Sequence, residues 1–201
     1  MNLSISEKAE AYFVQGLDLF GSRQHEKAIK YFNEAINLSP NYADVYLSRG
    51  DAYRVLKQYE RAIQDYNKAI QLKPNYDEAY FGRGVTCYAL SEYKQAIVDF
   101  DKAIRLNPND ADYYSFRGGS CRGLGQYERA IQDYSKAIQL NPNEADYYNG
   151  RGLIYMLSLK QYDRALSDLE RAMFLKPSDD FYHETYQQCL RALERSMRPE
   201  Y

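Results

Sequence analysis

Residues 43–76 read ADVYLSRGDAYRVLKQYERAIQDYNKAIQLKPNY, and near-copies of this stretch fill most of the 201-residue chain. One alanine returns at a nearly constant spacing of 34 residues, and the members of this series are Ala28, Ala62, Ala96, Ala130 and Ala165. Each copy closes on a Leu-x-Pro tripeptide, as at Leu72 to Pro74. A period of this length is typical of a solenoid, in which each unit is too small to bury its apolar face alone and stacks on its neighbours.

Each copy divides into two amphipathic halves. With columns numbered from 1 at Ala43, the apolar columns 4, 8 and 11 of the first half share one side of a helical wheel, and columns 17, 20, 21, 24, 27 and 28 of the second half do the same. Glycine recurs at column 8, where it costs about 1 kcal/mol relative to alanine inside a helix. Its recurrence predicts a close approach of the facing helix, and we expect the alanine at column 20 there. Proline at column 32 ends the second helix.

These columns resemble the tetratricopeptide repeat. The resemblance rests on the aromatic residues at columns 4 and 24, the glycine at 8, the alanines at 20 and 27 and the proline at 32. It implies an all-α, right-handed α-solenoid of helix-turn-helix repeats with about 11 helices. The expected parts are an N-terminal arm or cap at 1–8, five repeats within 9–177 (9–42, 43–76, 77–110, 111–144 and 145–179) and a capping helix at 180–198.

Three local features carry further expectations. Ser4 and Glu7 fit a capping box at the start of the first helix. Repeat five has one extra residue between Leu157 and Tyr162, so we expect its inter-helix turn to differ. The side chains expected to cover the last repeat are those of Phe181, Tyr182, Tyr186, Leu190, Leu193 and Met197.

Two columns change together between repeats, which predicts an ion pair. Column 7 carries Arg49, Arg83, Arg117 and Arg151, and column 23 carries Asp65, Asp99, Asp133 and Asp168. Repeat one breaks both columns at once, with Gln15 and Tyr31. Both columns flank the packing face of their helix, so we expect a partly buried, bidentate arginine–aspartate bridge within each of repeats two to five. The alternative is a ladder of arginines that binds an acidic partner.

The resemblance also implies that successive first helices line a concave surface where ligands often lie. The candidate partner-binding residues there are Phe13, Leu17, Leu47, Asp51, Arg54, Phe81, Val85, Tyr88, Ser115, Gly119, Arg122, Leu153 and Met156. We expect an extended or helical segment with apolar anchors to dock in a hollow bordered by Phe81, Tyr88 and Met156. The alternative is that the glycines only permit tight packing and that the N-terminal arm covers Phe13. The acidic residues at column 2 are assigned to the dipole of the first helical turn rather than to a basic ligand.

Composition excludes several other classes of function. Lys and Arg number 26 against 28 Asp and Glu, so no strong field attracts nucleic acid. The three cysteines have no metal-like spacing, and we expect them to fill the core in a reducing compartment. No paired-histidine zinc motif or phosphate-binding loop is present in the sequence, so neither catalysis nor a cofactor or metal is expected. The start of the chain lacks the features of a signal peptide, so we expect a cytoplasmic location and no insertion into a membrane.

The predicted function is therefore a non-catalytic scaffold that binds a peptide or helix of another protein in the concave groove. The chaperone-tail clamp known in the family is not expected, because its positions are here Phe13, Leu17, Ser48, Glu78 and Gly82 in the first possible register, and the two other registers fail as well. Two alternatives remain: an assembly factor or co-chaperone for a multisubunit or membrane complex, and a scaffold that self-associates through its ends. We expect a monomer or a weak homo-oligomer.

Overall fold

The computed structural model describes residues 4–197, and in this range the chain is all-helical, without strands. It divides into two compact parts, an N-terminal block of residues 1–108 and a C-terminal block of residues 109–201. The N-terminal block contains α1 (Ile5–Gly21), α2 (His25–Leu38), α3 (Ala43–Val55), α4 (Tyr59–Leu72), α5 (Asp77–Ala89) and α6 (Tyr93–Leu106). The C-terminal block contains α7 (Ala111–Gly123), α8 (Tyr127–Leu140), α9 (Ala145–Leu153), the π-helical turn η1 (Ile154–Ser158), α10 (Tyr162–Leu175) and α11 (Asp180–Ser196).

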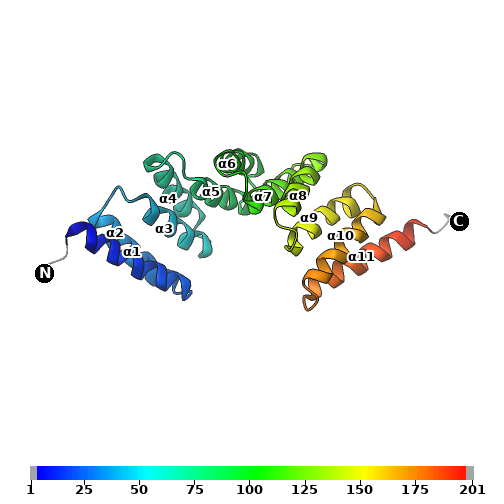
Figure 1. Cartoon of the computed structure of the whole chain (residues 1–201), viewed down its shortest axis with the longest axis horizontal. Coiled ribbons are helices and arrows are strands. Elements are labelled where there is room, and N and C mark those ends of the chain that lie inside the picture. The colour runs from blue at the N-terminus through cyan, green and yellow to red at the C-terminus, as the bar shows by residue number, and fades with distance from the viewer. Residues whose placement is uncertain (1–3, 198–201) are drawn as a thin grey trace. The chain divides into compact units, whose positions relative to one another are not determined.

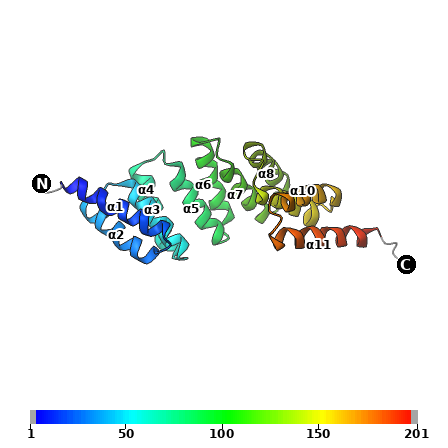
Figure 2. The same ribbon diagram turned by 60° about the horizontal axis from the view of Figure 1, so that its bottom comes forward.

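Helices pair along the chain inside each block (Figure 1). In the N-terminal block α1 packs on α2, α3 on α4 and α5 on α6, while α2 also contacts α3 and α4 contacts α5. Among the first helices, α3 contacts both α1 and α5, and Figure 2 shows these helices from a second direction. In the C-terminal block α7 packs on α8, α9 on α10, and α11 on α10. The expected fold class, an α-solenoid of paired helices, is confirmed.

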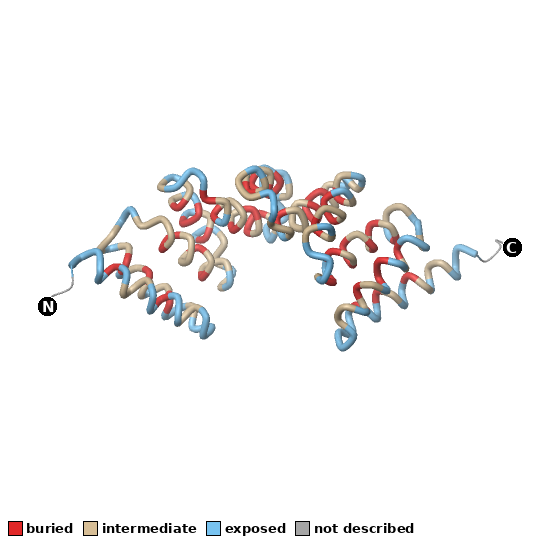
Figure 3. The backbone as a smooth tube through the Cα atoms, in the orientation of Figure 1, coloured by how far each residue is buried: buried red, intermediate tan, exposed pale blue. Residues whose placement is uncertain are grey.

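Burial follows the predicted columns (Figure 3). The alanines at columns 20 and 27 are completely buried in all five repeats, and so are the column 24 side chains Phe32, Tyr66, Phe100 and Leu169. The close approach at column 8 is real, but its main partner is the aromatic residue at column 24. A Cβ on Gly50 would lie 2.9 Å from Cε1 of Tyr66, and one on Gly84 would lie 2.6 Å from Cε1 of Phe100. The ring therefore occupies the space that the missing side chain leaves.

The extra residue of repeat five is absorbed at the end of the first helix. Residues Ile154–Ser158 form a π-helical turn, which takes up one residue without breaking the helix. Beyond it, Lys160 has φ 56°, the same left-handed conformation as Lys57 (φ 58°) in the turn of repeat two. The bond that closes the turn does differ, because Gln161 N donates to Tyr155 O, six residues back, whereas Gln58 N donates to Tyr53 O, five residues back. The expectation of an altered turn is therefore correct for this bond and wrong for the left-handed lysine.

The structure confirms the expected start of the first helix, but it differs from the expectation in the N-terminal arm and in part of the C-terminal cap. The capping box is confirmed, since Glu7 N donates to Ser4 Oγ (3.2 Å) and Ser4 N donates to Glu7 Oε2 (2.7 Å). Because α1 already begins at Ile5, residues 5–8 belong to it and form no separate arm over Phe13. At the other end Tyr182 is buried, but Phe181 and Met197 are 55% and 72% exposed and do not cover the last repeat.

Candidate functional site

The four expected arginine–aspartate bridges are present in the structure. Each is bidentate: in repeat three, Arg83 Nε donates to Asp99 Oδ2 (2.9 Å) and Nη2 donates to Oδ1 (2.6 Å). The Nη2–Oδ1 distances are 2.7 Å for Arg49–Asp65, 2.6 Å for Arg117–Asp133 and 2.8 Å for Arg151–Asp168. The aspartates are nearly buried while the arginines keep about a fifth of their side chain exposed, as for Asp99 (1%) and Arg83 (20%). This geometry is that of a strong charge-assisted pair.

Sequence analysis missed the third bond that these arginines make. Nη1 of Arg49 donates to Asn33 Oδ1 (2.6 Å) and Nη1 of Arg83 donates to Asn67 Oδ1 (2.5 Å), in each case on the second helix of the preceding repeat. In repeat five the acceptor is Ser135 Oγ, 2.8 Å from Nη1 of Arg151. Each of these arginines therefore ties together the second helices of two adjacent repeats. The asparagines at column 25 of repeats one and two were a signal for this contact.

The acidic residues of column 2 also have a role that the sequence did not reveal. Tyrosine hydroxyls donate to them from the residue that precedes the next first helix, from the next repeat or from the cap. The pairs are Tyr42–Glu10, Tyr76–Asp44, Tyr147–Asp112 and Tyr182–Asp146. The last two pairs have O–O distances of 2.6 and 2.7 Å. Burial, together with the hydrogen bond to Asp146, raises the pKa of Tyr182 to about 12. The column 2 carboxylates thus latch one repeat to the next, in addition to lying in the first helical turn.

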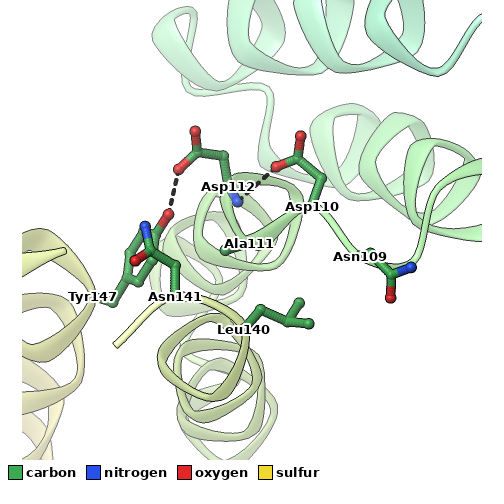
Figure 4. A pocket seen from close by; sticks show the side chains of 7 residues that line it. All are labelled: Asn109, Asp110, Ala111, Asp112, Leu140, Asn141 and Tyr147. Atoms are coloured by element: carbon green, nitrogen blue, oxygen red, sulfur yellow. Dashed lines mark hydrogen bonds between the residues drawn. The ribbon is translucent and has the colours of Figure 1, made fainter. Parts of the chain in front are cut away.

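A hollow of about 280 Å³ in the C-terminal block belongs to one of these latches (Figure 4). Asn109, Asp110, Asp112, Asn141 and Tyr147 are among the residues that line it. Asp110 Oδ1 accepts the N–H of Asp112 (2.9 Å), and Asp112 Oδ1 accepts the hydroxyl of Tyr147. Both carboxylates are therefore engaged in holding the fold. Among the described residues no group of three or more His, Cys, Asp or Glu is placed to hold a metal ion.

The candidate partner-binding residues of the N-terminal block form what we call the first-helix face, made by columns 5, 9 and 12 of α1, α3 and α5. Leu17 is 40% exposed, while Phe13, Leu47, Phe81, Val85 and Tyr88 are half-buried. The Phe13 ring packs on Tyr42 with centroids 5.1 Å apart, and Phe81 packs on Phe100 at 5.8 Å. The face is therefore apolar and partly open to solvent.

One polar cluster interrupts this apolar face. Tyr66 donates its hydroxyl to Asp51 Oδ1 (2.8 Å), Arg54 Nε donates to the same hydroxyl (3.2 Å), and Arg54 Nη2 lies 3.3 Å from Asp51 Oδ1. The two charged side chains are about one third exposed. Tyr66 reaches them because Gly82 has no side chain: a Cβ there would lie 2.6 Å from Cε1 of Tyr66.

The first-helix face of the C-terminal block, on α7 and α9, is more polar. Ser115, Arg122 and Leu153 are half-buried, and Gly119 is buried. Met156 was wrongly assigned to this surface. It is only 4% exposed and packs in a core cluster with Ala165, Leu169 and Cys189, because the π-helical turn changes the direction of the side chains that follow Leu153. Asn149 on α9 was not among the candidate residues. It is 6% exposed, and its Oδ1 has no hydrogen-bond partner among the described residues.

A pairing between columns 24 and 6 also escaped notice in the sequence. Where column 24 is tyrosine, column 6 of the next repeat is glycine, as for Tyr66 with Gly82 and Tyr134 with Gly150. After Phe32 the corresponding residue is Ser48. Cβ atoms on Gly82 and Gly150 would lie 3.1 and 2.8 Å from the tyrosine hydroxyl oxygens, so the glycine makes room for the extra oxygen.

Among the described residues, no helix combines the length and the apolar character needed to cross a membrane. Comparison with family models matches most of the chain. Models described as "TPR repeat" match residues 16–56, 50–91 and 118–158, and models described as "Tetratricopeptide repeat" match residues 77–110 and 145–179.

Similar solved structures cover most of the chain. MamA (residue 41 to the end) from Desulfovibrio magneticus RS-1 is 25% identical with a TM-score of 0.79, covering 88% of this chain and 99% of that one. YrrB, described as a TPR protein with an unusual peptide-binding site, is 21% identical with a TM-score of 0.71, covering 88% and 90%. A thermophilic TPR protein of Thermus thermophilus is 19% identical with a TM-score of 0.72, covering 90% and 98%.

A curated relative matches only part of the chain. An uncharacterized protein of Methanocaldococcus jannaschii is 40% identical over 50 residues, which are 25% of this chain. The match spans 58% of that relative's length.

Proposed function

Because the chain belongs to the tetratricopeptide repeat family, we propose that it is a non-catalytic interaction module that holds a segment of a partner protein on its first-helix face. Family membership supports a protein-binding role in general terms. The observation that carries the finer proposal is the apolar first-helix face of the N-terminal block. Leu17 and Val55 are 40% and 44% exposed on or beside it, next to half-buried aromatic rings. Exposed apolar side chains grouped on one face are typical of a docking surface.

The other conspicuous groups of the molecule are already used by the fold. The buried aspartates bind arginines, and the column 2 carboxylates accept tyrosine hydroxyls. The cysteines are free and buried, and burial raises the pKa of the Cys87 thiol to about 11, which disfavours a nucleophilic thiolate. These features support a scaffold rather than an enzyme.

Polar residues at both ends support a monomer rather than a scaffold that stacks end to end. At column 10, repeats two to five bury Ala52, Thr86, Ser120 and Ile154 completely, whereas repeat one exposes Asp18. At the other end α11 has the register of a first helix but carries an exposed Gln187 in place of the column 8 glycine. A further repeat would have to bury these polar groups on stacking. Sedimentation equilibrium should give one protomer mass over a wide concentration range, and a mass that rises with concentration would favour the self-associating alternative.

The proposal is tested with Leu17→Glu, because Leu17 is exposed and its replacement leaves the core intact. Val98→Glu on α6 is the matched control, since Val98 is 57% exposed on a second helix. Proteins retained by the intact chain from an extract are identified by mass spectrometry and then compared between the two variants. We expect the specific partner to be lost with Leu17→Glu and kept with Val98→Glu. Retention by both variants, with helical content unchanged, would remove the first-helix face of the N-terminal block from consideration.

A further inference from the structure

Repeat two contains a complete carboxylate site made by its own residues. Asp51 at column 9 accepts the hydroxyl of Tyr66 and lies against Arg54, which also donates to that hydroxyl. The carboxylate is thus held by one guanidinium and one hydroxyl on the first-helix face.

Repeat four repeats this arrangement with one member missing. Arg122 and Tyr134 each lie 68 residues, or two repeats, after Arg54 and Tyr66, but the residue 68 positions after Asp51 is Gly119. The tyrosine ring packs against a glycine of the next repeat in both places. A Cβ on Gly150 would lie 2.5 Å from Cε1 of Tyr134, and a Cβ on Gly82 would lie 2.6 Å from Cε1 of Tyr66. Repeat four therefore keeps the cation and lacks the carboxylate.

The guanidinium of Arg122 has no partner of its own. It makes no hydrogen bond or ion pair with any described residue, although its side chain is half-buried in α7. The arginines of column 7 in contrast each bind a buried aspartate. A half-buried guanidinium without an acceptor is suited to take an external carboxylate, whose two oxygens match its planar donors.

A half-buried guanidinium without an acceptor matches the carboxylate of an acidic peptide. We propose that Arg122, beside Gly119, binds a carboxylate of an acidic peptide. This inference rests on the proposed function and specifies the chemistry of the partner segment.

A first test needs no ligand. Gly119→Asp restores the residue type of repeat two and should place a carboxylate within reach of Arg122. We expect Gly119→Asp to raise the melting temperature relative to Gly119→Ala, and we expect this gain to disappear when Arg122→Gln is added. An equal effect of the aspartate with and without Arg122 would show that a carboxylate beside residue 119 does not reach the guanidinium, and would overturn the proposal.

The second test uses random short peptides that carry an N-terminal biotin, synthesised once as C-terminal acids and once as C-terminal amides. The intact protein is the bait, and Arg164→Gln is the matched control because Arg164 is exposed on the second helix α10 and already donates to Gln161 Oε1 (3.1 Å). We expect retained peptides to contain Asp or Glu, or to come only from the acid library if the carboxylate is the C-terminus. Arg122→Gln should weaken them about tenfold to a hundredfold, and Arg164→Gln should leave them unchanged.

The outcomes separate this inference from the proposed function. Peptides that bind without any carboxylate, or that bind Arg122→Gln as well as the unaltered protein, overturn the inference and leave peptide binding standing. If neither library yields a bound peptide, peptide binding fails and the inference fails with it.

Discussion

Replacing Arg83 by leucine should destabilise the protein far more than its partial exposure suggests. Its partner Asp99 is only 1% exposed and receives two of its hydrogen bonds, at 2.9 and 2.6 Å. Removal of one partner from a buried ion pair leaves the other charge without compensation, which costs about 3–5 kcal/mol. Because Arg83 keeps 20% of its side chain exposed, water can reach the carboxylate in part, and we expect a loss of about 3 kcal/mol.

The double variant Arg83→Leu/Asp99→Leu should recover most of this loss. Two leucines of similar volume leave no buried charge, and such exchanges are often neutral. We expect the double variant to lie within about 1 kcal/mol of the unaltered protein, which implies a coupling of about 2 kcal/mol or more between the two sites. Asn67 loses its bond to Nη1 in either case, but the Asn67 amide lies near the surface and water can replace that donor.

Urea unfolding followed by far-ultraviolet circular dichroism measures these free energies. Arg54→Leu is the control, because the Arg54–Asp51 pair is about one third exposed and should contribute only about 0–1 kcal/mol. Destabilisations that add up simply in the double variant would mean that Arg83 and Asp99 act independently, and the interpretation of columns 7 and 23 as structural pairs would have to be abandoned.

Three further perturbations test other parts of the structure. The pKa of Tyr182 is raised from its ordinary value of about 10 to about 12, so its hydrogen bond to Asp146 should stabilise the fold fully below pH 10 and lose this effect as the pH rises through 12. In urea unfolding at increasing pH, Tyr182→Phe should therefore lose less stability than the unaltered protein. The same loss in both proteins would argue against the latch. Lys57→Gly removes a lysine in the left-handed conformation and should raise the free energy of unfolding by about 0.5–1 kcal/mol, whereas Gly125→Ala at φ 72° should lower it by about 1 kcal/mol. Thermal unfolding in which Gly125→Ala is the more stable of the two variants would contradict this account of the turns. Deletion of Leu157, which is 56% exposed, should turn the π-helical turn into regular α-helix with little change in stability, and a crystal structure that retains the π-helical turn would refute this explanation of the insertion.

The sequence was sufficient for the fold because the same columns recur in register. The alanines at columns 20 and 27 and the arginine–aspartate columns each offered several independent copies of one contact, so a pattern in one repeat could be checked against the others. The pairs of columns 7 and 23 were found through repeat one, where Gln15 and Tyr31 replace both members.

Contacts between repeats were harder to predict because they join columns whose spacing depends on how helices stack. The tyrosine latches join residues 32 to 36 positions apart, and the donor changes column between Tyr42 and Tyr147. Met156 was misplaced because the helical wheel assumes about 100° per residue, which a π-helical turn does not follow. The repeated Leu-Lys-Gln-Tyr at Leu56 to Tyr59 and at Leu159 to Tyr162 places the insertion before Leu159, and thus within the helix.

Site-specific photocrosslinking tests the central claim, that the partner lies on the first-helix face, most directly. A photoreactive benzoylphenylalanine is placed at Leu17 on α1, which is 40% exposed, or at Val98 on α6, which is 57% exposed. After irradiation in an extract, the account predicts that one protein is covalently attached at Leu17 and not at Val98. Attachment of that protein at Val98 with none at Leu17 would contradict the claim.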